Sequence, residues 1–181
     1  EGLWKGQYLW DLYDKSKTPF QWHSELFRFA KKNKIICFSS PFDETAVDLL
    51  EELNTPFYKV ASPEITHIPL IKKIAKTKKT IIMSTGMANL KEIDLAYKVA
   101  KQNGAKSIII LYCVSKYPAQ ISDYNFNNIK ILKKRFGCKI GFSDHSLDNR
   151  VAATAIACGA ELIEKHIALR MKRNLLIINF L

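Results

Sequence analysis

The sequence predicts an α/β fold of repeated strand–helix units, either a (β/α)₈ TIM barrel or a doubly wound sheet. Short apolar runs recur roughly every 22–32 residues, and a helix-like segment separates each run from the next. The runs are apolar almost throughout, which is typical of parallel strands buried on both faces. Repeats of this kind build barrels and doubly wound sheets. No GxGxxG motif follows any run, which disfavours a dinucleotide-binding sheet.

The first elements follow from capping residues and apolar spacing. The opening of the chain, up to Lys17, is rich in aromatic residues but shows no regular period, so we expect it to be irregular. Thr18 and Pro19 predict the N-cap and first residue of a helix. Residues 34–40 (KIICFSS) predict a strand, and Asp43 is expected to cap the helix that follows.

The remaining elements alternate in the same way. Strands are predicted for residues 57–62, 80–85, 107–113, 139–146 and 161–169. Helices are predicted between them for residues 69–76, 90–102, 125–136 and 147–158. Gly104 is expected to end the second of these helices. Six predicted strands thus alternate with helix-like segments, and the barrel and the doubly wound sheet both remain candidate folds.

Composition and charge narrow the class of protein. The 181 residues are 48% hydrophobic, which suffices for one core. The formal charge of +11 comes mostly from lysine clusters on predicted helices, and these clusters contain almost no aromatic residues, which disfavours a nucleic-acid groove. The four cysteines form no CxxC pair and predict reduced thiols. With no signal peptide or membrane span in view, we expect a cytoplasmic protein.

Polar side chains stand at the C-terminal end of every predicted strand. They are Ser39 and Ser40; Lys59, Ser62 and Glu64; Ser84 and Thr85; Ser115 and Tyr117; Ser143 and His145; Glu164 and His166. In a barrel these ends converge on one face, where active sites are built. The sequence therefore predicts a polar site on that face.

Two of these strand ends carry a histidine, His145 in GFSDHS and His166 in ELIEKHIAL. A crossover of about a dozen residues separates the two runs, as parallel neighbours require, so both imidazoles are expected at one sheet edge. Imidazole is the commonest side-chain metal ligand, and Asp144 and Glu164 could support such ligands. Ordinary polar packing of the two histidines is the alternative.

Lys59 lies inside an apolar strand, where a lysine must reach solvent or meet an anion. Hydroxyl groups at neighbouring strand ends and a lysine are typical of phosphate binding. A Schiff-base aldolase that uses Lys59 or Lys165 is a second hypothesis, although Lys165 alternates with Glu164 and His166 and is expected to face away from them. A non-catalytic binding protein is a third.

Five motifs carry a resemblance to a known family. In chain order they are FSSPFDETAVDLLEELNTPFYKVASPEITHIPLI, IIMSTGMANLKEI, LYCVSKYP, GFSDHS and IEKH. The chain resembles the sialic acid synthase family, the phosphoenolpyruvate-dependent synthases of nonulosonic acids, over nearly all of residues 1–170. The segments GLWKG, TPFQWH and SKYPA are most similar to the pseudaminic acid branch. The N-acetylneuraminate and legionaminic acid branches are the alternatives.

The resemblance implies that residues 1–170 form an incomplete (β/α)₈ TIM barrel of about six of eight βα units. It also implies a C–C bond-forming transferase. Phosphoenolpyruvate condenses with the open-chain aldehyde of an N-acylated sugar, and phosphate leaves by C–O cleavage after water attacks C2. In the pseudaminic branch the sugar is a 2,4-diacetamido-2,4,6-trideoxyhexose. The resemblance further implies that His145 and His166 hold a divalent metal, manganese or magnesium, which polarises the aldehyde.

The resemblance also assigns roles to other strand-end residues. Those that match phosphoenolpyruvate-binding positions are Ser40, Lys59, Ser62, Ser115 and Ser143. Ser40 and Ser115 stand where relatives can carry threonine and asparagine. Glu64, Tyr117 and Glu164 match catalytic or substrate-contacting positions.

Both ends of the chain depart from the family pattern. The family has two further strands before this sequence begins, and a catalytic glutamate lies on them. After EKH it continues into an antifreeze-like domain that covers the partner's site in a homodimer. Here residues 171–181 predict a divergent tail, with the antifreeze-like domain absent. A second hypothesis therefore holds that the isolated chain is an inactive barrel fragment.

Overall fold

The chain divides into two units after Cys37 in the computed structural model, which describes residue 6 and residues 8–167. The first unit contains helix α1 (Leu9–Ser16) and helix α2 (Phe20–Lys32). The expectation of an irregular opening is therefore wrong for α1, whose short length hides its period. Thr18 is not the N-cap either: Pro19 takes that position, and no side chain caps α2.

The second unit is a sheet of five parallel strands in the order β1-β2-β3-β4-β5. The strands are β1 (Phe57–Val60), β2 (Thr80–Ser84), β3 (Ser107–Cys113), β4 (Lys139–Asp144) and β5 (Ile163–Lys165). The helices are α3 (Glu44–Glu52), α4 (Ile68–Lys76), α5 (Leu90–Gln102), α6 (Asn127–Phe136) and α7 (Asn149–Ala157). Two 3₁₀ turns, η1 (Pro63–Thr66) and η2 (Ile121–Asp123), follow β1 and β3.

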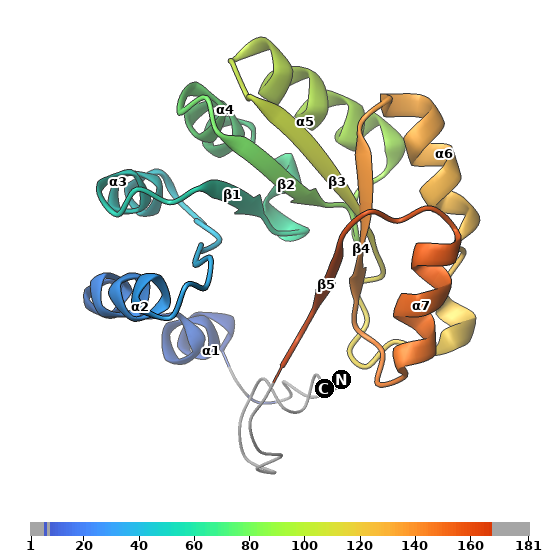
Figure 1. Cartoon of the computed structure of the whole chain (residues 1–181), viewed down its shortest axis with the longest axis horizontal. Coiled ribbons are helices and arrows are strands. Elements are labelled where there is room, and N and C mark those ends of the chain that lie inside the picture. Colours follow the sequence, from blue (N-terminus) through green and yellow to red (C-terminus); the bar gives the residue numbers. More distant parts are fainter. Residues whose placement is uncertain (1–5, 7, 168–181) are drawn as a thin grey trace. The chain divides into compact units, whose positions relative to one another are not determined.

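The sheet has the arrangement of a barrel wall. Its strands follow chain order without a reversal, and α4 to α7 lie along its convex side (Figure 1). A doubly wound sheet would instead reverse its strand order and carry helices on both faces. Of the two predicted folds, the strand order and the curvature of the sheet therefore agree with the barrel and not with the doubly wound sheet.

The predicted strand at residues 34–40 is not present. Lys34 adopts a left-handed backbone with φ of 58°, and the Ile35 N–H donates to Ala30 O, so the beginning of the run closes the end of α2. Ile35 and Ile36 are 63% and 70% exposed and do not enter a core. Within residues 8–167 the sheet therefore begins at β1 and has five strands instead of six.

Sequence signals place the other elements closely. Asp43 accepts a hydrogen bond from the Ala46 N–H and caps α3, while Asn89 and Glu92 form a capping box on α5. Gly104 has φ of 101° just past α5, as predicted. Residues 168–169 of the predicted last strand and the predicted tail, 171–181, lie outside the described residues.

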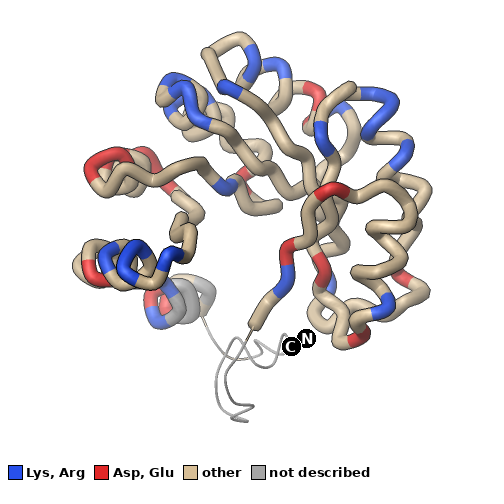
Figure 2. The backbone as a smooth tube through the Cα atoms, in the orientation of Figure 1, with Lys and Arg blue, Asp and Glu red and all other residues tan. Residues whose placement is uncertain are grey.

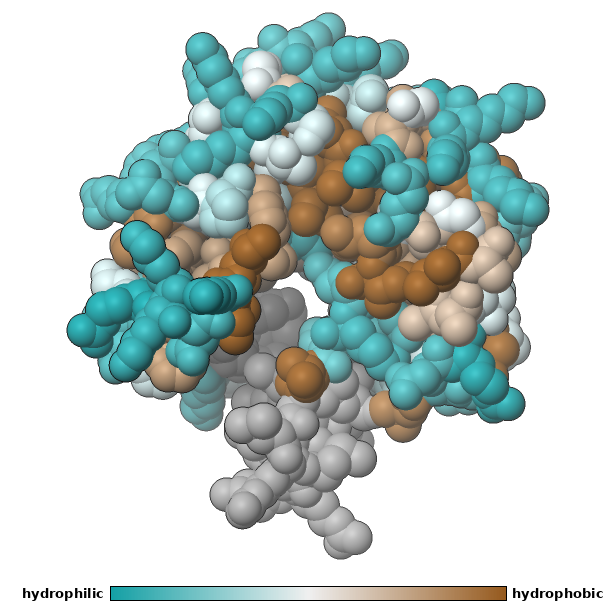
Figure 3. Space-filling model, in the orientation of Figure 1, coloured by the Kyte–Doolittle hydropathy of each residue, from teal (hydrophilic) through white to brown (hydrophobic). Residues whose placement is uncertain are grey.

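The core lies between the sheet and its helices. Tyr58, Ile81, Ile110 and Phe142 point outward from successive strands and are fully buried. Figure 3 shows hydrophobic side chains between the sheet and the helices, with hydrophilic side chains on the outer helices. The opposite face of the same strands carries the polar residues of the site, since successive side chains alternate across a strand.

The basic clusters lie on the helices. Lys and Arg residues mark the outer surfaces of α4 and α6 (Figure 2), and several pair with acidic side chains on neighbouring helices. Lys73, for example, lies 2.6 Å from Asp48. No helix in the described ranges has the length and apolarity needed to cross a membrane.

Candidate functional site

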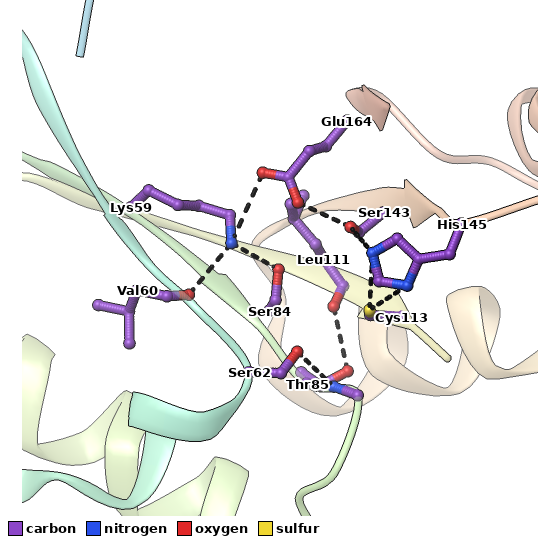
Figure 4. A network of polar contacts seen from close by, with 11 residues as sticks. Lys59, Val60, Ser62, Ser84, Thr85, Leu111, Cys113, Ser143, His145 and Glu164 are labelled. Atoms are coloured by element: carbon purple, nitrogen blue, oxygen red, sulfur yellow. Dashed lines mark hydrogen bonds and ion pairs between the residues drawn. The ribbon is translucent and has the colours of Figure 1, made fainter. Parts of the chain in front are cut away.

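Lys59 occupies the centre of the site. Tyr58 donates from its hydroxyl to Glu51 Oε1 at 2.7 Å, which shows that Tyr58 faces α3 and Lys59 the concave face. Lys59 Nζ donates to Ser84 Oγ at 2.7 Å and lies 3.5 Å from Glu164 Oε2 (Figure 4). Its side chain is only 7% exposed. The predicted anionic partner of this buried lysine is therefore present on the distant strand β5.

Burial lowers the pKa of Lys59, while the negative charge of Glu164 opposes that shift. The ammonium group thus retains less solvation than a surface lysine and depends on anionic neighbours for stability. An incoming phosphate or carboxylate would supply further compensation.

Glu164 joins Lys59 to the end of β4. Its Oε1 accepts a hydrogen bond of 2.7 Å from Ser143 Oγ, while its Oε2 faces Lys59. Ser143 and Glu164 are register partners of adjacent strands, so the contact follows from the strand pairing. This carboxylate therefore orients the cation and a hydroxyl together.

His145 has a defined tautomer. Its Nδ1 lies 2.8 Å from Val114 O, and because a carbonyl only accepts, Nδ1 carries the proton. Its Nε2 lies 3.4 Å from Ser143 Oγ, and Cys113 Sγ lies 3.9 Å from the ring. The unprotonated Nε2 is therefore on the side of the ring that faces the polar cluster.

His166 lies beside His145, as the sequence predicts. Their ring centroids are 5.5 Å apart. Tyr117 stacks on His145 at 4.0 Å and makes a T-shaped contact with His166 at 5.8 Å. Loss of solvation lowers the pKa of both histidines, so neutral imidazoles are favoured. Burial raises the pKa of Tyr117 to about 12, which keeps its hydroxyl protonated.

The two histidines are a suitable but partial metal site. Neutral imidazole nitrogens are the form that binds a metal. Among the described residues, no cluster of three or more His, Cys, Asp or Glu side chains could hold an ion. Two neutral imidazoles could hold a metal ion as part of a ligand set.

Three further groups converge on Gly86, in the loop after β2. The Gly86 N–H donates to Ser62 Oγ at 3.1 Å. A Cβ at Gly86 would overlap Ser115 Oγ and lie 3.0 Å from Ser62 Oγ and 3.2 Å from Cys113 Sγ. The absence of a side chain at Gly86 thus lets the loop approach both predicted serines.

The Glu64 side chain, on η1, has a buried carboxylate oxygen, Oε2, without a hydrogen-bond partner among the described residues. Burial raises the pKa of Glu64, and the charge of Lys59 only partly offsets this effect. A buried oxygen without a partner is costly, and a substrate hydroxyl or water could satisfy it.

Asp144 does not support the histidines as expected, and the role of Ser40 stays a prediction. Ser40 is half-buried, and no hydrogen bond or ring contact connects it to the cluster in the described structure. Asp144 points away from the histidines: it accepts from the Ser146 N–H at 2.9 Å and from Lys165 Nζ at 2.6 Å. Lys165 accordingly faces away from Glu164, as predicted.

Sequence reasoning placed Ser84 among the polar strand ends but gave neither Ser84 nor Cys113 a specific role. Ser84 stands two residues after Ile82, the register partner of Lys59, so the strand period alone places it on the same face. The sequence predicts a reduced thiol at Cys113; the side chain is buried, and it also contacts His145.

Several known synthases are similar to this chain in sequence. The pseudaminic acid synthase of Helicobacter pylori is 43% identical over 167 residues, which are 92% of this chain and 49% of that protein. The N,N'-diacetyllegionaminic acid synthase of Campylobacter jejuni is 44% identical over 160 residues, 87% of this chain and 48% of that protein. The chain thus spans about half the length of the curated relatives that it matches.

A solved structure shows the same fold. The N-acetylneuraminic acid (sialic acid) synthetase of Leptospira borgpetersenii, crystallised with citrate, superposes with a TM-score of 0.89 at 30% identity. The match covers 94% of this chain and 59% of that one. The five described strands are therefore part of a (β/α)₈ barrel.

The family match extends over residues 1–175. It includes every strand and every site residue described above, and it agrees with the resemblance to the sialic acid synthases. The chain belongs to the NeuB family.

Proposed function

We propose that this protein condenses phosphoenolpyruvate with the open-chain aldehyde of an N-acylated amino sugar, that it releases phosphate, and that its product is pseudaminic acid. The observation that carries the proposal is the buried Lys59, whose ammonium group is held by Ser84 and Glu164. Similarity to three synthases of nonulosonic acids supports the reaction class.

The reaction can be written with all atoms balanced. The C3 carbon of phosphoenolpyruvate bonds to the aldehyde carbon, whose oxygen takes a proton. Water then adds to C2, and the C2–O bond to phosphate breaks. The products are a 2-keto sugar acid and inorganic phosphate.

The first role of the site residues is to bind phosphoenolpyruvate. Lys59 binds the anionic groups of phosphoenolpyruvate, assisted by hydroxyls of Ser62, Ser115 and Ser143. Ser40 is proposed to join this set when substrate is bound.

Glu64, whose carboxylate has a raised pKa, can accept a proton from the attacking water. Tyr117, which stays protonated beside the two histidines, can donate a hydrogen bond to the sugar. Glu164 holds Lys59 and Ser143 in position for both substrates.

His145 and His166 would hold a divalent metal, manganese or magnesium. Such an ion, when bound, acts as a Lewis acid on the aldehyde oxygen. The protein's own contribution is to keep both rings neutral and to fix the His145 tautomer through Val114 O.

The test is phosphate release from phosphoenolpyruvate, manganese and the 2,4-diacetamido-2,4,6-trideoxyhexose. Lys59→Met is expected to lower kcat/KM by about 100-fold, because it removes a buried charge that meets the anion. Lys79→Met is the matched control, since Lys79 also pairs with a glutamate but lies directly before β2, at the opposite end of the strands from the site. Unchanged turnover in Lys59→Met, or no phosphate release by the wild type, would refute the proposal.

The sugar is tested in the same assay. Preference for the diacetamido sugar of the legionaminic branch or for N-acetylmannosamine would reassign the product, because similarity to the legionaminic acid synthase is equally high. Borohydride trapping of a substrate on Lys59 would favour the aldolase hypothesis. Lys165 is not a good candidate for that chemistry, since Asp144 and Ser146 O occupy its amine.

The setting of the reaction is also a proposal. The free cysteines, Cys37, Cys113, Cys138 and Cys158, suit the reducing cytoplasm. Homodimer formation, which the resemblance implies, can be measured by light scattering.

A further inference from the structure

Two three-residue runs lie side by side at the site, Ser143-Asp144-His145 at the end of β4 and Glu164-Lys165-His166 at the end of β5. The strand register pairs Ser143 with Glu164 and Asp144 with Lys165. Side-chain contacts follow the same order, with hydrogen bonds in the first two pairs and a ring distance of 5.5 Å in the third. The first and third pairs belong to the site described above, and the middle pair does not.

The middle pair lies on the opposite face of the sheet. The Asp144 side chain is 0% exposed, and its Oδ2 lies 2.6 Å from Lys165 Nζ. Lys165 Nζ also donates to Ser146 O at 2.8 Å, while Asp144 Oδ1 accepts from the Ser146 N–H at 2.9 Å. The Lys165 amine therefore contacts both neighbours of His145 in the chain, the Asp144 carboxylate and the Ser146 carbonyl.

This contact stands where the main-chain ladder ends. The last register pair of β4 and β5 is Asp144 with Lys165, and β5 has only three residues. Beyond that pair, neither histidine belongs to a described strand. The ion pair is thus the last direct link between the two strands before His145 and His166.

Burial gives the link its rigidity. A pair of exposed charges contributes little, because water and salt screen it. Here the carboxylate is fully buried, so loss of the lysine would leave an uncompensated charge and would force the strand end to rearrange.

We propose that Lys165 and Asp144 are positioning residues that set the spacing of His145 and His166 for a divalent metal. They act from behind the sheet and touch neither substrate nor metal. The inference rests on the proposed function, because it requires that the two histidines bind a metal.

The experiment measures manganese affinity of the full chain by electron paramagnetic resonance, with thermal melts and phosphoenolpyruvate binding in parallel. Lys165→Met removes the link, and Lys165→Arg retains a cation. D144N/K165M removes both charges, so that no buried carboxylate is left unpaired. Lys133→Met is the matched control, because Lys133 pairs with Glu161 at 3.1 Å near the other end of β5.

Lys165→Met and the double variant are expected to bind manganese about 10–100-fold more weakly, as for other groups that orient metal ligands. Phosphoenolpyruvate binding should remain within about twofold of wild type. Lys165→Arg should recover most of the affinity, and Lys133→Met should keep all of it. Electron spin echo spectra should show two bound imidazole nitrogens in the wild type and one in Lys165→Met.

Three results would overturn the inference. They are wild-type manganese affinity in Lys165→Met, an equal loss in Lys133→Met, and unfolding of both Lys165→Met and the double variant where Lys133→Met stays folded. His145→Ala separates this failure from that of the metal site itself. If His145→Ala binds manganese normally, the two histidines are not the ligands and the proposed metal role fails as well.

Discussion

At the scale of single residues, the buried charges define what the site can bind. A lysine inside an apolar strand predicts an anionic partner, and the structure provides Glu164. The identity of that partner could not be predicted, because it comes from a strand more than a hundred residues away and depends on barrel curvature. Glu64 shows the same limit, since the burial of its Oε2 depends on how η1 packs.

Glu64→Gln is expected to stabilise the folded chain at neutral pH. Burial raises the pKa of Glu64 from its ordinary value of 4.5, so the folded chain binds this proton more tightly than the unfolded chain. The free energy of unfolding of the wild type therefore falls as pH rises from about 4.5 through the raised pKa. Glutamine has no such charge, so the stabilisation should appear at pH 7 and vanish below about pH 4.5.

Urea denaturation at pH 4, 5.5 and 7 measures this difference. Glu52→Gln, at an exposed position of α3, is the control and should show no comparable gain at pH 7. A Glu64→Gln variant that is less stable than wild type at pH 7 would contradict the stated environment of the carboxylate.

Gly86→Ala is expected to raise the KM for phosphoenolpyruvate about tenfold. The added Cβ would overlap Ser115 Oγ and crowd Ser62 Oγ. Both hydroxyls would have to rotate out of the positions proposed to bind phosphoenolpyruvate. The melting temperature should change little, because only side-chain ends must move. Met87→Ala, at the exposed neighbouring position, is the control, and an unchanged KM in Gly86→Ala would count against the role of these serines.

At the scale of elements, strand β4 depends on a glycine. A Cβ at Gly141 would lie 2.5 Å from Leu111 Cδ2 and 2.6 Å from Leu162 O. The second contact is with the backbone that pairs with β4, since the Phe142 N–H donates to Leu162 O at 2.8 Å. Gly141 therefore permits the close approach of β4 to the segment that leads into β5.

Gly141→Ala is expected to lower the free energy of unfolding by about 1–3 kcal/mol through overpacking. Chemical denaturation measures the loss. Lys139→Ala, at the exposed start of the same strand, should cost far less. Equal stability of wild type and Gly141→Ala would show that β4 and Leu162 are not packed as described.

Most elements of the second unit follow from local signals. The strand β3 and the helix α5 have the predicted bounds, because apolar runs and caps such as Asn89 lie in the sequence itself. The strand predicted at residues 34–40 is wrong, because an apolar pattern cannot show that Lys34 and Ile35 complete the turn after α2. Pairing between strands is a long-range property, which the pattern of one segment does not contain.

At the scale of the whole molecule, sequential strand order carries the functional prediction. Because all five strands run parallel, their C-terminal ends meet at one edge, and residues from β1 to β5 form one cluster. The sequence predicted this convergence for Lys59, Ser62, Ser143, His145, Glu164 and His166. The contact between Asp144 and Lys165, which point outward from the sheet, could not be predicted in this way, because it depends on the register of β4 and β5.

Hydrogen exchange should reflect the two units. Helix α4 buries four of its residues, whereas α2 buries His23 and Ala30 alone among those described in it. We expect amides of β2, β3 and α4 to exchange only on global unfolding and amides of α2 to exchange faster. Equal protection in α2 and β3, measured by mass spectrometry, would contradict this difference.

The most direct test of the proposed reaction follows the bridging oxygen of phosphoenolpyruvate. The chain is supplied with manganese, the diacetamido sugar and phosphoenolpyruvate that carries ¹⁸O between C2 and phosphorus. Cleavage of the C2–O bond predicts that the label appears in inorganic phosphate, and only when the sugar is present. Unlabelled phosphate, or release that does not require the sugar, would contradict the condensation proposed for Lys59 and its neighbours.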